Sequence, residues 1–255
     1  ESIRKHIDDL PYEVDDIGKS NSIVLIFEEY ILKITTLSFD IQNELHVYKM
    51  LFGKLPIPKI IEYVEQDGKA YILKEKLKGK MLCDEEYLNN PKLLFKLATD
   101  AIRLLWNVDI KGLDLQNTFE TIMDFGKYCL ANNYINFADS DKCITNRFND
   151  FYEIVKYLES NRPKTDNVLT HGDLCITNII VDGDKVVGFI DLGLTGIDHR
   201  YHDLAILYRS IKYNFEGRYG KAYDGFDDKA IFELLGVKKD DKLIEYFLKI
   251  KKVGT

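Results

Sequence analysis

The chain of 255 residues has little of what marks secreted, membrane-bound and fibrous proteins. Its four cysteines show no metal-type spacing and no obvious disulfide framework, so we expect a reducing, cytoplasmic location. No apolar run approaches the roughly 18 residues that a membrane helix requires, and there is no signal-peptide pattern. The sequence also lacks an internal repeat and a low-complexity tract. These absences indicate a globular protein that does not act on a membrane.

The charge balance argues against a nucleic-acid partner. The formal net charge is −7, from 42 acidic against 35 basic residues. Binding to nucleic-acid phosphates needs an excess of positive charge, whereas an acidic protein suits a cationic ligand. The hydrophobic content of 45% is ordinary for a globular protein, and the length allows one or two domains.

The most informative stretch is a hairpin predicted over residues 179–190, with polar residues at both of its ends. Asn178 precedes the first strand and Asp191 follows the second, so a rigid hairpin holds these two side chains close together. A further strand over 168–170 leads into the loop that carries Asp173.

These three polar residues suit phosphoryl transfer. Mg²⁺ prefers hard oxygen ligands and completes its shell with water and nucleotide phosphates, so Asn178 and Asp191 suffice as its protein ligands. Asp173 then faces the hydroxyl that receives the phosphate. The alternative is that Asp173 and Asp191 are ordinary turn residues. The spacing of all three residues around one hairpin favours the catalytic interpretation.

The same residues resemble a known family. The motif is His-Gly-Asp at 171–173, Asn at 178 and Ile-Asp-Leu-Gly at 190–193. It is similar to that of the aminoglycoside phosphotransferases, most closely the aminoglycoside 3′-phosphotransferases, whose fold is like that of eukaryotic protein kinases. The resemblance runs from about Tyr12 to Tyr246.

The resemblance implies an α+β, bilobal, protein-kinase-like fold, with a small antiparallel-sheet N-lobe that has one helix and a mainly helical C-lobe. We place the nucleotide-binding N-lobe at residues 1–79 and the C-lobe, with the catalytic loop and the acceptor site, at 80–255. The implied cofactors are ATP, or GTP, and Mg²⁺. The implied acceptor is a hydroxyl of a small cationic molecule, an aminoglycoside antibiotic, which would make the protein a resistance enzyme.

A lysine on a predicted strand gives further support. Lys33 follows apolar residues in the run 30–34, and a strand lysine with apolar neighbours usually needs a charge partner or an anionic ligand. Glu44 lies in a predicted amphipathic helix over 40–51 and could reach back to Lys33. This resembles the kinase lysine–glutamate pair that aligns the α- and β-phosphates. The alternative is an exposed edge-strand lysine and an unrelated helix charge.

Two other segments are candidates for nucleotide contacts. The loop 18–22 contains Gly-Lys-Ser, but Glu13 occupies the position of the upstream glycine that a Walker A motif requires. Ser20 in this loop could lie across phosphates, and a plain hairpin turn is equally acceptable. In the resembling family the segment after the strand 69–75 supplies backbone groups to the nucleotide base. The candidate base contacts are Glu75 and Leu77 through their backbone and Ile31 as an apolar floor.

The rest of the chain is predicted to be helical, with apolar residues at core-helix spacing. The predicted helices cover residues 92–106, 119–130, 148–158, 202–211, 230–235 and 243–250. Asp203 opens one of these helices and resembles the family aspartate that anchors the catalytic loop through its backbone. Simple stabilisation of a helix N-terminus predicts the same residue type.

The acceptor site departs from the family pattern. A polycationic acceptor needs clustered carboxylates, and Asp139 and Asp141 lie where the family has an acidic substrate loop. Elsewhere the expected acidic residues, and one arginine, are replaced. The replacements are Leu194, Lys212, Tyr213, Asn214, Lys251 and Lys252.

Three other functions remain to be weighed. One is a kinase of another small metabolite or antibiotic. A second is a nucleotide-binding module without turnover, which has no need of Asp173, Asn178, Asp191 and Lys33 together. A protein kinase is disfavoured because no Ala-Pro-Glu-type segment follows residues 191–193. The sequence leaves open ATP or GTP, the hydroxyl that is modified, and the oligomeric state.

Overall fold

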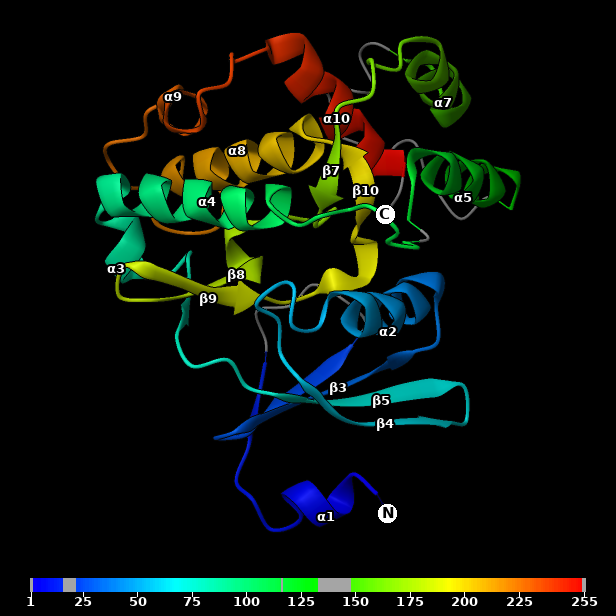
Figure 1. The fold of residues 1–255 in the computed structure, drawn as a ribbon, viewed down its shortest axis with the longest axis vertical. Helices are drawn as coiled ribbons and strands as arrows, with labels where there is room; N and C mark the ends of the chain where they lie inside the picture. The colour runs from blue at the N-terminus through cyan, green and yellow to red at the C-terminus, as the bar shows by residue number, and fades with distance from the viewer. Residues whose placement is uncertain (1, 16–21, 116, 133–147, 254–255) are drawn as a thin grey trace.

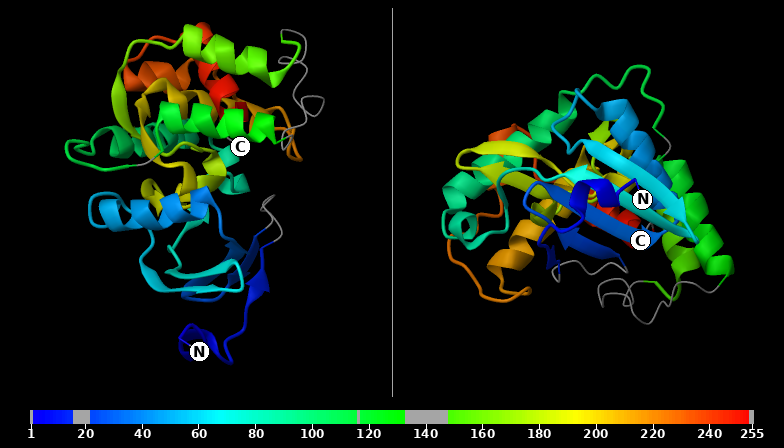
Figure 2. Two further views of the ribbon diagram at one scale, coloured as in Figure 1. Left: turned by 90° about the vertical axis from the view of Figure 1, so that its right-hand side faces the viewer. Right: turned by 90° about the horizontal axis from the view of Figure 1, so that it is seen from below.

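The computed structural model describes residues 2–15, 22–115, 117–132 and 148–253, with side chains to residue 250. Figure 1 shows two parts, one built on a sheet near the N-terminus and one that is mainly helical. Helix α2 lies between the sheet and the helical part in both Figure 1 and the left view of Figure 2, while α1 lies on the far side of the sheet. The predicted α+β architecture is confirmed.

The N-terminal sheet is antiparallel with the strand order β1-β2-β3-β5-β4. Its strands are β1 (Glu13–Val14), β2 (Ile23–Ile26), β3 (Tyr30–Thr36), β4 (Ile60–Gln66) and β5 (Lys69–Glu75), and α1 (Arg4–Ile7) precedes them. Because β3 pairs with both β2 and β5, Lys33 lies on the central strand, as predicted, and not on an edge. On one face Ile72 packs against α2, and on the other Leu32 and Leu73 form a small separate cluster.

Helix α2 (Phe39–Leu51) begins at the N-cap Ser38, whose hydroxyl accepts the N–H of Ile41. The buried side of the helix differs from the prediction in one respect. Asn43 and Glu44 are fully buried, whereas the apolar pattern predicts that Glu44 lies only beside the buried face. Buried polar groups need partners, and the Glu44 carboxylate and the Asn43 side-chain nitrogen find them in other elements, whereas Asn43 Oδ1 has none among the described residues.

The second part is built from seven helices among the residues that the structure describes. They are α3 (Glu85–Leu88), α4 (Pro91–Trp106), α5 (Phe119–Ala131), α7 (Phe151–Ser160), α8 (Tyr201–Phe215), α9 (Ala230–Leu235) and α10 (Asp241–Val253). The helix predicted over 148–158 begins later because Asp150 is its N-cap and accepts the N–H of Glu153 at 2.8 Å. No helix in the described ranges is long and apolar enough to cross a membrane.

Two small sheets lie where the parts meet. One has the order β6-β8-β9 and contains the predicted hairpin, and the other pairs β7 with β10. Their strands are β6 (Lys80–Met81), β7 (Asn167–Thr170), β8 (Ile179–Asp182), β9 (Lys185–Phe189) and β10 (Gly196–His199). Gly79 has a φ of 146° and lies so close to Val181 that a Cβ would overlap its carbonyl oxygen. The division of the chain at residue 79 remains a prediction.

Candidate active site

Backbone hydrogen bonds to Asp203 hold the loop that carries Asp173. Strand β7 ends at Thr170, and Asp203 in the first turn of α8 accepts the N–H of His171 at 2.7 Å and that of Gly172 at 2.9 Å. Burial raises the pKa of Asp203, while the nearby histidines and these two N–H donors act in the opposite direction. The buried carboxylate thus connects the helix to the loop, the arrangement expected from the resemblance.

Gly172 is required at its position. Its φ is 79°, in the left-handed region that residues with a Cβ rarely adopt, and a Cβ there would overlap the carbonyl oxygen of Leu194. The loop can therefore pass directly over the segment that follows Asp191 only because residue 172 has no side chain.

His171 connects the same loop to the hairpin. The ring is fully buried, and Nε2 lies 2.8 Å from the carbonyl oxygen of Ile190. Since a carbonyl only accepts, Nε2 carries the proton, and Nδ1 accepts the N–H of Asp173 at 3.3 Å. Thr195 Oγ1 donates to the His171 carbonyl oxygen at 3.2 Å. These bonds fix the spacing between the Asp173 loop and the segment that carries Asp191.

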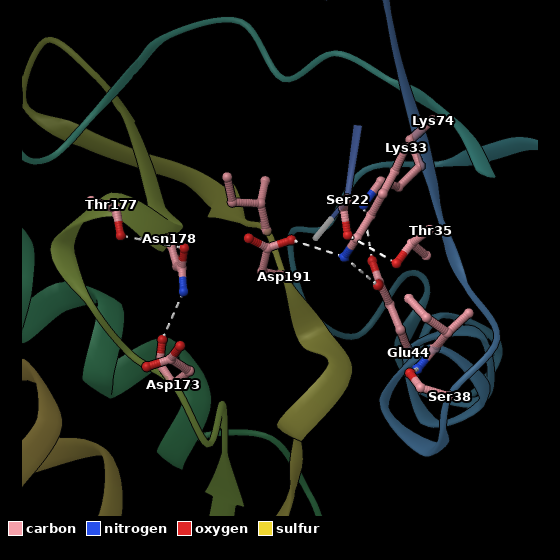
Figure 3. Close-up of polar contacts among 12 residues, drawn as sticks. Ser22, Lys33, Thr35, Ser38, Glu44, Lys74, Asp173, Thr177, Asn178 and Asp191 are labelled. Atoms are coloured by element: carbon pink, nitrogen blue, oxygen red, sulfur yellow. Dashed lines mark hydrogen bonds and ion pairs between the residues drawn. The ribbon is translucent and has the colours of Figure 1, made fainter. Parts of the chain in front are cut away.

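The structure brings Asn178 and Asp191 together, as predicted from the hairpin. Asn178 is the last residue of the short 3₁₀ helix η2 (Ile176–Asn178), and its carbonyl oxygen accepts the N–H of Ile190 at 3.1 Å. Its side-chain Nδ2 donates to the Asp173 carbonyl oxygen at 2.8 Å. Because the amide nitrogen is held in this way, Oδ1 is the atom that faces away from Asp173 (Figure 3).

Asp191 has a left-handed backbone with a φ of 58°, a conformation that costs energy for a residue with a Cβ and is found at functional sites. It precedes the short 3₁₀ helix η3 (Leu192–Leu194), and 56% of its side chain is exposed. Its Oδ1 lies 3.4 Å from Lys33 Nζ, so the structure brings the hairpin and the N-terminal sheet together at this point.

Asp173 lies below Asn178 in the view of Figure 3, while Asp191 lies between Asn178 and Lys33. The Asp173 side chain is half-buried, and Cys175 Sγ donates to its Oδ1 at 3.3 Å. A thiol is a weak donor, so the carboxylate keeps its capacity to accept a stronger hydrogen bond.

Lys33 and Glu44 form the predicted ion pair. Lys33 Nζ lies 3.0 Å from Glu44 Oε2, and the Glu44 side chain is only 1% exposed. The other carboxylate oxygen of Glu44 lies 2.9 Å from Nζ of Lys74, a residue that the sequence did not single out. Burial raises the pKa of Glu44, but the charges of Lys74 and Lys33 outweigh it and bring the pKa to about 2.

Asn43 fixes helix α2 against the segment after Asp191. Its Nδ2 donates to the carbonyl oxygens of Gly193 at 2.9 Å and Thr195 at 3.0 Å. Two adjacent residues of α2 therefore connect the two parts of the protein. Glu44 binds the lysines of the sheet, and Asn43 binds the loop that follows Asp191. The sequence shows only an asparagine within an amphipathic helix, and its burial and its partners became visible in the structure.

The remaining candidates for nucleotide contacts lie apart from these ion pairs. Ile31 is half-buried on β3, on the same sheet face as Lys33. The Glu75 N–H donates to the carbonyl oxygen of Lys59 at 2.9 Å, so only the carbonyl group of Glu75 could contact a base. Leu77 follows β5 and is half-buried. Ser20 lies outside the described residues.

The end of α8, where the resemblance predicts acidic residues, carries Tyr213 and two basic side chains, Lys212 and Arg218, both paired with Glu216. Tyr213 is half-buried near the end of α8, and the Arg218 guanidinium lies 3.8 Å from its ring centroid. Asn214 Nδ2 donates to the carbonyl oxygen of Ser210 at 2.8 Å. The side chains of Lys251 and Lys252, and the whole of Asp139 and Asp141, lie outside what the structure describes.

Comparison with protein families matches residues 13–233 to the phosphotransferase enzyme family (APH). An aminoglycoside 3′-phosphotransferase of Niallia circulans is 32% identical over 247 residues, which cover 93% of this chain and 90% of that protein. Another, of Enterococcus faecalis, is 30% identical over 235 residues, covering 91% and 85%.

Comparison with solved structures finds the same fold. The aminoglycoside phosphotransferase APH(3″)-Id of Streptomyces rimosus superposes with a TM-score of 0.78 at 19% identity, over 99% of this chain and 96% of that one. An aminoglycoside 3′-phosphotransferase of type VIII gives 0.77 at 17% identity, over 100% and 98%. APH(3″)-Id has also been solved in complex with ADP and streptomycin.

Proposed function

The chain belongs to the phosphotransferase enzyme family, and from that premise we propose that it transfers the γ-phosphate of ATP to a hydroxyl of an aminoglycoside. The observation that carries the proposal is that Asp173, Asn178 and Asp191, from one short stretch of the chain, lie beside Lys33, which comes from the distant N-terminal sheet (Figure 3).

Asp173 orients the acceptor hydroxyl and accepts its proton late in the transfer. Phosphoryl transfer depends mainly on positioning and electrostatic stabilisation, so the precision of the loop matters more than the basicity of the carboxylate. The bonds from His171 and Gly172 to Asp203 supply that precision. The thiol of Cys175 donates to one carboxylate oxygen of Asp173 and helps to orient the group.

Asn178 and Asp191 fit Mg²⁺. Both offer hard oxygen atoms. Asn178 Nδ2 is held by the Asp173 carbonyl oxygen, so Oδ1, which accepts a long hydrogen bond from Thr177 at 3.4 Å, is the amide atom that would bind the metal. No group of three or more His, Cys, Asp or Glu side chains among the described residues could hold a metal, so the nucleotide phosphates would complete the shell. When bound, Mg²⁺ neutralises charge on the β- and γ-phosphates.

Lys33 contacts the α- and β-phosphates while Glu44 holds its ammonium group in place. The base lies against Ile31 and is read by the backbone of Glu75 and Leu77, and Ser20 covers the phosphates. The contact between Lys33 and Asp191 places the phosphate-binding cation beside the metal-binding carboxylate, so one nucleotide can engage both. GTP could serve through the same phosphate contacts.

The acceptor is proposed from the relatives of at least 30% identity, which are named aminoglycoside 3′-phosphotransferases. The net charge of −7 favours a cationic substrate. Asp139 and Asp141 are the carboxylates assigned to its ammonium groups. Because ATP is the proposed donor and the cysteine spacing shows no disulfide framework, the cytoplasm is the compartment we assign.

The experiment is a transfer assay with matched acceptors. Purified protein, ATP and Mg²⁺ are incubated with an aminoglycoside that has a 3′-hydroxyl and with its 3′-deoxy counterpart. We expect ADP release and the mass gain of one phosphoryl group only with the first compound. Phosphorylation of both would move the site to another hydroxyl. Transfer to neither, while a panel of neutral or anionic alcohols is phosphorylated, would exclude aminoglycosides.

A kinase of a different small molecule is the second candidate. It is favoured by Lys212, Tyr213 and Arg218 at the end of α8, where Glu216 pairs with both basic side chains and leaves a formal charge of +1. An aromatic ring beside a net positive charge suits an aromatic or anionic alcohol better than a polycation. The panel of alcohols distinguishes the two candidates.

A further inference from the structure

Lys74 and Lys33 both form ion pairs with the carboxylate of Glu44. In the register of the sheet Ile31 lies opposite Lys74 and Ile72 opposite Lys33, so the two lysines point to the same face. Lys74 Nζ lies 2.9 Å from Glu44 Oε1, and Lys33 Nζ lies 3.0 Å from Glu44 Oε2. Each oxygen of a single carboxylate is therefore held by a different lysine.

Lys74 and Glu44 form a charged pair below the sheet. The Lys74 side chain is 6% exposed, and an ammonium group this deeply buried is costly unless it is paired. Burial lowers the pKa of Lys74, but the Glu44 carboxylate and Tyr48 outweigh it, so the net shift is upward. Lys74 Nζ also lies 5.5 Å from the centroid of the Tyr48 ring, a cation–π contact. The trio of Lys33, Glu44 and Lys74 thus has a net charge of about +1.

This charge changes what Lys33 can do. With Lys33 as its only partner, a buried carboxylate would engage the ammonium group with both oxygens and cancel its charge. Because Lys74 holds Oε1, Lys33 keeps one oxygen and directs its remaining donors elsewhere. In the structure Lys33 uses one of them toward Asp191, 3.4 Å away.

We propose that Lys74 is a positioning residue for nucleotide binding: it holds and partly neutralises Glu44, so that Lys33 remains a cation toward the phosphates. The proposal rests on the role assigned above to Lys33. Lys74 does not touch the nucleotide phosphates in this arrangement and acts only through the Glu44 carboxylate. If Lys74 only filled space under the sheet, replacing it would affect folding. Its effect on nucleotide binding would then not depend on whether Glu44 is present.

The test replaces Lys74 with methionine, which keeps the length and removes the charge. We expect the KM for Mg-ATP to rise about tenfold, because Glu44 then neutralises Lys33 alone and weakens its attraction for the phosphates, while kcat changes by less than about threefold. Lys74→Arg keeps the charge and should stay within about threefold of the wild-type KM. Lys69→Met is the matched control, because Lys69 is an exposed lysine of the same strand.

The decisive comparison repeats Lys74→Met in a Glu44→Gln background. Without the carboxylate Lys74 has nothing to position, so the KM should rise by less than about twofold. An equal rise in both backgrounds, or no rise in the wild-type background, overturns the proposal. If Lys74→Met does not fold, as judged by circular dichroism, Lys74→Gln takes its place with the same expected contrast.

A separate measurement isolates this inference from the proposed function. Calorimetric binding of Mg-ADP needs no acceptor, so it reports on Lys33 and Lys74 even if no aminoglycoside is phosphorylated. Wild-type binding that weakens about tenfold in Lys74→Met supports the inference whatever the acceptor. Equal binding by the two proteins contradicts it, even if aminoglycoside transfer is observed.

Discussion

Replacing Asp203 with asparagine tests how the loop around Asp173 is held. The two carboxylate oxygens of Asp203 accept the N–H groups of His171 at 2.7 Å and Gly172 at 2.9 Å, and Asp203 is fully buried. Asparagine has nearly the same shape but only one acceptor oxygen. Its amide nitrogen must then face one of the two N–H donors, and that donor loses its partner.

The magnitude follows from the bonds that are lost. A hydrogen bond to a charged group contributes roughly 1.5–3 kcal/mol, and an unpaired buried donor costs about 1–3 kcal/mol. Burial raises the pKa of Asp203 because it disfavours the charged carboxylate. Replacing the carboxylate with a neutral amide removes this cost and offsets part of the loss. We expect the free energy of unfolding to fall by about 3 kcal/mol, which lowers the Tm by roughly 6–12 °C for a chain of this length.

Thermal and denaturant unfolding measure the stability, and the transfer assay measures kcat. We expect kcat to fall at least about tenfold, because misplacing a catalytic group by a small distance is costly. Asp224→Asn, at an exposed position, is the matched control. If Asp203→Asn melts within about 1 °C of the wild type and keeps full kcat, the loop is not held by this carboxylate, and the reasoning is refuted.

Four further predictions concern the site itself. Asp173→Asn should lower kcat by about 10²–10⁴-fold with little change in calorimetric nucleotide affinity, and a fully active variant would remove Asp173 from the mechanism. Asp191→Ala should abolish transfer and weaken Mg-ADP binding; an unchanged Mg²⁺ titration would contradict its assignment as a ligand. Gly172→Ala should lower both Tm and kcat, because its Cβ overlaps the Leu194 carbonyl oxygen, and wild-type values for both would refute the need for glycine. The lowered pKa of Glu44, about 2 in the folded protein, means that its charged form stabilises the fold at pH values above its ordinary pKa of 4.5. This contribution is lost as the pH falls from 4.5 toward 2, because the unfolded chain binds the proton first. Denaturant unfolding between pH 5 and pH 2 should therefore vary less in Glu44→Gln, and an equal slope in both proteins would contradict the pair.

The local sequence pattern was sufficient to predict most of the helices and strands. The strand predicted at 69–75 and the helix predicted at 230–235 are found as β5 and α9 with the predicted bounds. One boundary differs because of a cap: Asp150 is the N-cap of α7, so the helix begins three residues after the predicted start at residue 148. A cap depends on one side chain and its backbone geometry, which hydrophobic periodicity does not describe.

The sequence by itself determined the hairpin and the residues at its ends, because strand alternation and a short turn are local properties that fix which side chains lie near each other. It also predicted the pairing of Lys33 with Glu44, through a resemblance that carries long-range information. Only the tertiary structure decided that Glu44 serves Lys74 as well, and that Asn43 binds the carbonyl groups of Gly193 and Thr195. Those partners are separated by 30 to 152 residues, and whether a polar residue on a helix is exposed or buried against a distant partner depends on how the sheet, helix and hairpin pack together.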